Sequence, residues 1–137
     1  MKAEQVVDES SEADAPSETI MLRLPALAAY GRIARMSGAE LALRRGLSLS
    51  AVEDLRLAID EVLILLLGHR NHEGSIQLRY ELFANAVAIS FQPEFDDGRP
   101  EYPSDATERF AALAGPLLDD FTIDAETAMV SIVKGSI

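Results

Sequence analysis

The 137-residue sequence predicts an α/β (α+β) sandwich in which helices cover one face of a mixed sheet. Two observations predict this class. Apolar residues recur at helical spacing in two long segments, and short segments with strand-like patterns precede and follow them. The predicted order is β-α-α-β-β-α-β-β, without an internal repeat, so that most strands come in pairs able to form hairpins. The length fits one domain with its own core.

The first half of the chain is expected to hold one strand and two helices. The strand covers residues 20–24 and closes at a proline. A helix is expected from residue 26 to about residue 45, followed by a glycine suited to a helix C-terminus. The second helix opens at Ser48 or Ser50, with acids in its first turn, and runs to Leu67.

The second half is expected to be richer in strands. Residues 75–82 alternate apolar and polar side chains, as a half-buried strand does, and a tight turn leads to the antiparallel neighbour over residues 86–91. The remaining predicted elements are an irregular loop over residues 92–104, a short helix from Asp105 that ends or kinks at Gly115-Pro116, and two last strands over residues 121–123 and 129–133.

Composition excludes several classes of protein. A formal charge of −11 and a pI near 4.5 argue against nucleic-acid binding, which basic surfaces lead. The chain has no cysteine, so a disulfide framework or a thiolate zinc site is impossible. No apolar run approaches the roughly 20 residues that span a bilayer. The sequence therefore predicts a soluble, cytoplasmic protein without membrane contact.

The charges are unevenly spread. Residues 1–19 hold six acids against Lys2 and are expected to form a disordered acidic tail, so that the folded domain covers residues 20–137. Residues 23–46 hold five arginines against one acid, and they read either as solvated surface or as a docking face for an acidic partner.

The second predicted helix carries the most informative pattern. Residues four apart on a helix lie on one face, so Glu61, Leu65 and His69 form a single row. Residues 54–61, which lead into this row, resemble part of the motif Glu-x-x-x-Asn-x-x-x-His of the bacterial anti-sigma-factor serine kinases. These are small switch proteins of the GHKL ATPase superfamily. Residues 119–124 and 131–134 resemble the family's closing strands, so the resemblance runs over residues 20–134 and implies a GHKL (Bergerat-like) sheet.

The resemblance also assigns roles to single positions. In that family the helix Glu is a general base, and the Asn four residues later coordinates the magnesium ion bound to ATP. Here Glu61 stands at the base position, and Leu65 replaces the Asn. A leucine has no lone pair for a hard cation. Other family positions differ as well: Pro93 stands for an aspartate, Glu108 and Phe110 for two phosphate-binding glycines, and Ala128-Met129 for a Gly-Thr pair.

The resemblance thus predicts a vestigial nucleotide pocket with no catalytic residue and no cofactor. We expect Glu61 to be a rim charge paired with an arginine or with water. The apolar run 62–67 predicts that this part of the helix has no solvent-exposed face and that the pocket is collapsed or apolar. A metal site is not expected near His69 and His72, because a third well-placed ligand is missing. The predicted pocket consists of Glu61, Leu65, His69, Pro93 and Phe110.

By this resemblance the protein is expected to bind an alternative sigma factor of the stress or sporulation kind and to hold it away from RNA polymerase. The resemblance further implies a homodimer and a competing STAS-domain anti-anti-sigma protein. Arg32 looks like the family's sigma-contacting arginine on the first helix, with Arg35 and Met36 nearby. Two alternatives stay open: an active serine kinase that phosphorylates the anti-anti-sigma protein, and a scaffold or small-molecule sensor whose vacated pocket takes a lipophilic ligand.

Overall fold

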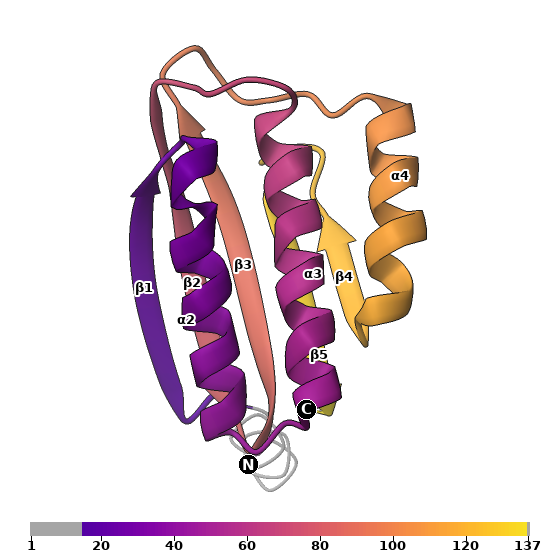
Figure 1. Cartoon of the computed structure of the whole chain (residues 1–137). Helices are drawn as coiled ribbons and strands as arrows, with labels where there is room; N and C mark the ends of the chain where they lie inside the picture. Colours follow the sequence, from indigo (N-terminus) through magenta and orange to yellow (C-terminus); the bar gives the residue numbers. More distant parts are fainter. Residues whose placement is uncertain (1–14, 137) are drawn as a thin grey trace, which may run out of the picture.

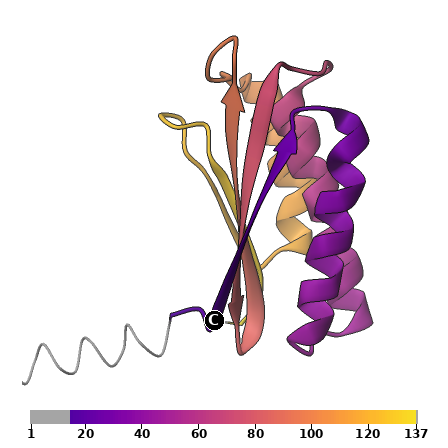
Figure 2. The same cartoon turned by 90° about the vertical axis from the view of Figure 1, so that its left-hand side faces the viewer.

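The computed structural model describes residues 15–136. They form a five-stranded sheet with three α-helices on one of its faces (Figure 1). Within residues 15–136 the other face carries no helix (Figure 2), so the predicted sandwich with helices on one face is confirmed. The elements are β1 (Glu18–Pro25), a 3-10 turn η1 (Ala28–Tyr30), α2 (Gly31–Arg44), α3 (Leu49–Leu67), β2 (Gly74–Phe83), β3 (Asn85–Phe95), α4 (Ser104–Ala114), a 3-10 turn η2 (Gly115–Leu117), β4 (Asp120–Ile123) and β5 (Val130–Ser136).

The strand order is β1-β2-β3-β5-β4, and all four neighbouring pairs are antiparallel. The prediction of a mixed sheet was wrong in this respect. The chain reverses direction between β1 and α2, between α2 and α3, and between α3 and β2. The strand β2 therefore runs antiparallel to β1. The strands β3 and β4 run in the same direction, but β5 lies between them, so no parallel strands become neighbours (Figure 1).

The first helix begins later than expected. Ala26 is held in place by β2, because its N–H donates to the Gly74 carbonyl and its carbonyl accepts from the N–H of His72. Only after the short turn η1 is the backbone free to begin α2 at Gly31. The start of α3 agrees with the prediction of Ser48 as N-cap, since its hydroxyl accepts from the N–H of Ala51 at 3.1 Å. The predicted acids in the first turn were wrong, because the helix begins at Leu49 and Glu53 and Asp54 therefore lie beyond that turn.

The strand β3 is longer than expected, and residues 92–95 belong to it rather than to a loop. Pro93 is buried and pairs with Ile76 of β2. Pairing between β3 and β5 stops at Phe91, so beyond that point β3 has β2 on one side only. Because one edge of this segment is unpaired, a proline without an N–H is tolerated there.

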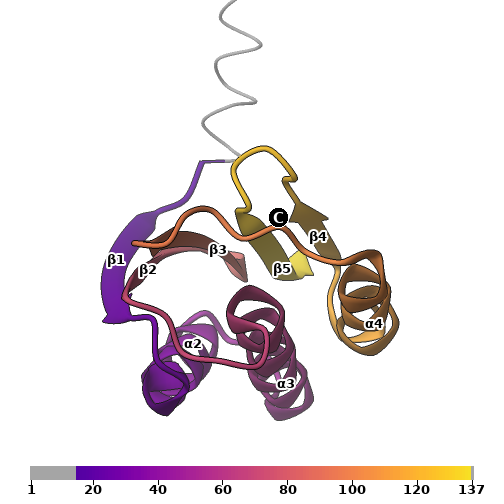
Figure 3. The same ribbon diagram turned by 90° about the horizontal axis from the view of Figure 1, so that it is seen from above.

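The core lies between the sheet and the helices. Gly38 of α2 allows close approach to α3, since a methyl group at this position would stand 2.6 Å from the Ile59 side chain. Tyr80 reaches up from β2 and donates to the Ala34 carbonyl at 3.2 Å, and burial raises the pKa of its hydroxyl to about 12. These contacts fix α2 over β2 and β3 and against α3, while α3 itself contacts β5 and α4 lies beside β4 (Figure 3).

Two predictions concern the ends and the surface of the chain. The strand β1 begins at Glu18, so the last two residues of the predicted tail belong to the sheet. Most of that tail, residues 1–14, lies outside the described residues. Within residues 15–136, every helix is too short or too polar to cross a bilayer.

Candidate functional site

The row predicted from helical spacing forms one wall of a groove between α3 and α4. Glu61, Leu65 and His69 all line this groove, whose volume is about 350 Å³, and Phe110 lines it from α4. Four of the five predicted pocket residues are therefore brought together. Pro93 is not among them, because it lines a separate hollow beside the end of β3. Pro93, which the resemblance places at the position of an aspartate in the family's pocket, thus does not line this groove.

An ion pair spans the groove. Arg109 of α4 donates to the Glu61 carboxylate at 2.6 Å, and Glu61 is largely buried by the contact. Pairing of Glu61 with an arginine agrees with the expected role of a rim charge. The carboxylate that the resemblance places at the base position is thereby engaged with a side chain of the same domain.

The floor of the groove is apolar. Leu65 is only 6% exposed, and the ring of Phe110 is fully buried. The Phe110 ring packs edge to face on Phe121 of β4, with centroids 5.2 Å apart and an interplanar angle of 81°. Leu65 and Phe110, which the resemblance places at the magnesium-ligand position and at one glycine position, thus belong to the core, whereas Glu108 at the other glycine position is exposed.

The apolar run 62–67 does have a solvent-exposed position, contrary to the prediction. Ile64 is 43% exposed, while the other five residues of the run are buried. Ile64 points between the neighbouring helices and lines grooves on both sides of α3. A helix with neighbours on three sides still leaves a narrow strip of surface, and Ile64 lies on it.

The loop before β5 contains one non-glycine residue in a left-handed backbone conformation. Ala128 has φ +65°, a left-handed conformation in which glycine is favoured. This is the position at which the resemblance expects the glycine of a Gly-Thr pair. The Ala128 carbonyl accepts from the Tyr102 hydroxyl at 2.6 Å, and burial raises the pKa of that hydroxyl. The loop is thus tied to the segment that leads into α4.

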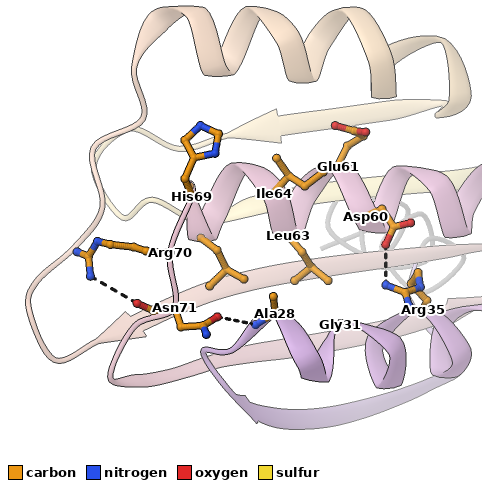
Figure 4. A pocket seen from close by; sticks show the side chains of 12 residues that line it. Ala28, Gly31, Arg35, Asp60, Glu61, Leu63, Ile64, His69, Arg70 and Asn71 are labelled. Atoms are coloured by element: carbon orange, nitrogen blue, oxygen red, sulfur yellow. Dashed lines mark hydrogen bonds and ion pairs between the residues drawn. The ribbon is translucent and has the colours of Figure 1, made fainter.

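A second groove lies on the opposite side of α3, between α3 and α2, and has a volume of about 500 Å³ (Figure 4). Its floor includes Gly31 and Leu63, and at one end Arg35 donates to the Asp60 carboxylate at 2.7 Å. Sequence reasoning missed this groove. The available signal was a pair of small residues, Ala28 in η1 and Gly31 at the start of α2, which leaves space opposite the leucines of α3.

The three predicted partner-binding residues have different surroundings. Arg32 is exposed and makes no ion pair within residues 15–136. Met36 is 57% exposed, one helical turn further along α2. Arg35 instead points into the groove toward Asp60 (Figure 4). The structure therefore places Arg32 and Met36 on open surface and Arg35 beside them in the groove.

The arginine-rich segment is less basic in the structure than in the sequence. Four of its five arginines are paired with carboxylates: Arg23 with Glu94, Arg35 with Asp60, Arg44 with Glu40, and Arg45 with Glu18. This arrangement favours the interpretation of the segment as solvated surface, with Arg32 as its exposed unpaired charge among the described residues.

His69 and His72, near which no metal site was expected, differ in their exposure to solvent. His69 is exposed at the rim of both grooves, whereas the His72 ring is buried under the turn that follows. Across residues 15–136, no three histidine or acidic side chains are grouped so that they could hold a metal ion.

Known proteins resemble this chain in overall fold and in part of its sequence. No protein-family model matches the sequence. The serine-protein kinase RsbW of Listeria innocua is 29% identical over 75 residues, which are 53% of this chain and 48% of the relative, so the chain matches about half the length of this relative. A crystal structure of the RsbU and RsbW domains of Rv1364c from Mycobacterium tuberculosis matches 88% of this chain and 32% of that one, with a TM-score of 0.59 and 18% identity. The predicted resemblance is confirmed: the chain is similar to the RsbW-type serine-protein kinases, in fold over most of its length and in sequence over about half of it.

Proposed function

We propose that this protein is an anti-sigma-type regulator that acts by binding a protein partner and does not use ATP to phosphorylate it. The observation that carries this proposal is the α3/α4 groove. Leu65, at the position that the resemblance gives to the magnesium ligand, is buried, and so is Phe110, at the position of a phosphate-binding glycine. Glu61, at the position of the general base, is paired with Arg109. The fold of the family persists while the groups that would bind magnesium and phosphate are replaced.

The partner proposed by the family resemblance is an alternative sigma factor, held in a cytoplasmic complex. A STAS-domain anti-anti-sigma protein is the proposed competitor, and a homodimer the proposed assembly. Arg32 and Met36 support a binding surface on α2, because both are exposed and lie on consecutive turns of the helix. Interfaces between proteins are enriched in arginine and methionine.

The absence of ATP binding is tested by thermal unfolding of the full chain with and without ATP and magnesium. We expect no saturable rise in the melting temperature. A site occupied at 100 times its dissociation constant adds about 2.7 kcal/mol, which for a domain of this size is a shift on the order of 10 °C. The Listeria RsbW relative is the positive control. A saturable shift in this protein would support the active-kinase alternative instead.

The α2 surface is tested by reversing the charge of Arg32. We expect Arg32→Glu to weaken binding to the sigma factor that co-purifies from the native host by roughly 10-fold or more, equivalent to about 1.4 kcal/mol. The matched control is Arg99→Glu, because Arg99 is likewise exposed and makes no ion pair within residues 15–136. Equal affinity of the two variants, measured by titration calorimetry, would remove Arg32 from the interface.

A further inference from the structure

The ring of His72 has an unusual combination of contacts. Its side chain is only 8% exposed and stacks on Phe95, with centroids 4.1 Å apart and planes 11° from parallel. One ring nitrogen, Nε2, lies 2.9 Å from the Leu67 carbonyl at the end of α3. The other, Nδ1, is buried and has no hydrogen-bond partner among residues 15–136. A buried polar atom without a partner is costly and calls for an explanation.

The contact with Leu67 fixes the proton on one side of the ring. A carbonyl oxygen only accepts, so Nε2 must carry a hydrogen and donate it. In the neutral ring Nδ1 then presents a lone pair. The group opposite this lone pair is the Asp97 carboxylate, whose Oδ1 lies 3.7 Å away and also only accepts. In a neutral His72 the Nδ1 lone pair therefore faces another acceptor, whereas a doubly protonated ring would donate to the Leu67 carbonyl and form an ion pair with Asp97.

We propose that His72 is a proton-responsive clamp, in which the doubly protonated ring joins the Leu67 carbonyl at the end of α3 to the Asp97 carboxylate that follows β3. The clamp links the turn over residues 68–73, part of which lines the α2/α3 groove, to the segment that leads into α4. The inference depends only on these contacts and is independent of the proposed function.

Other charged groups around the ring act in both directions. Arg70 donates to the second oxygen of Asp97 at 2.6 Å, and its positive charge opposes protonation of the ring. The C-terminal end of α3 and the side chains of Glu73 and Asp96, which line the same hollow, favour a positive charge. The hydrogen bond from Arg70 is the main reason that the pKa of Asp97 lies below its usual value. Asp97 therefore stays charged over the pH range in which imidazoles titrate, near 6.5.

The test is an NMR titration of the ring nitrogens of the 15N-labelled full chain. We expect Nδ1 of His72 to gain a proton on acidification while Nε2 stays protonated throughout. Asp97→Asn should move the His72 titration to lower pH, and Arg70→Gln should move it to higher pH. The exposed His69 serves as the internal control, and its titration should change less than that of His72 in both variants.

Stability supplies a second measurement. The ion pair exists only with a charged ring, so its contribution is present at low pH and is lost as pH rises through the imidazole titration. A double-mutant cycle of His72→Gln and Asp97→Asn, read as melting temperatures, should show coupling near pH 5.5 and none near pH 8. A coupling that is equal at the two pH values, or a His72 titration unchanged by Asp97→Asn, would overturn the clamp.

Discussion

Replacing Phe110 by alanine is expected to lower the free energy of unfolding by about 3–5 kcal/mol. The ring is fully buried between α3 and β4, and it makes the edge-to-face contact with Phe121. Removing it takes away this contact and leaves a space that opens into the α3/α4 groove. Urea denaturation of the full chain, followed by circular dichroism, measures the change.

The matched control is Leu113→Ala on the same helix. Leu113 is 47% exposed, so its truncation removes less buried surface and is expected to cost less than about 1 kcal/mol. If both variants lost the same stability, the Phe110 ring would not be part of the core. The space at this position would then be free for a ligand, and the proposal that the Phe110 ring blocks the family's phosphate site would be wrong.

The residues that line the α3/α4 groove could be predicted from the sequence only in part. The row of Glu61, Leu65 and His69 followed from helical spacing alone. In a regular helix such as α3, the position of a residue along the chain determines on which face its side chain lies. The meeting of this row with Phe110 followed only from the family resemblance. Spacing along one chain cannot tell which later helix will pack against which face.

The failed predictions have a common cause in long-range pairing. The loop expected at residues 92–104 begins four residues later, because β2 pairs with Pro93 and its neighbours. The helix expected at residue 26 begins at Gly31, because Ala26 is bonded to the start of β2. In both places a partner distant in sequence overrode a local signal, the proline in one case and helix propensity in the other.

The surface was predicted less well than the core. The arginines of residues 23–46 suggested a basic docking face, but four of the five have carboxylate partners, three of which are distant in sequence. The α2/α3 groove was not foreseen, since a groove depends on how far apart two helices pack. By contrast, Ala128 keeps a left-handed backbone where the resemblance expects glycine.

The second large effect is expected at Gly74, the first residue of β2. Its φ is +112°, and a methyl group there would overlap the Glu94 carbonyl and stand 2.9 Å from the Phe95 Cα atom. Gly74→Ala should therefore lower the free energy of unfolding by about 2–5 kcal/mol, the sum of backbone strain and displacement of β3. The effect extends to the site, because the Gly74 carbonyl accepts the bond from Ala26 that fixes the approach to α2.

The chain offers a close control for this substitution in Gly98. Its φ is +111°, nearly the same as that of Gly74, but a methyl group there would meet no atom within 4 Å. Gly98→Ala should cost only the backbone strain, about 1–2 kcal/mol. The difference between the two variants, measured by urea denaturation, isolates the close approach of β2 and β3. Equal losses would mean that β3 does not approach Gly74 this closely. The β2/β3 register that brings His72 close to Asp97 would then also be wrong.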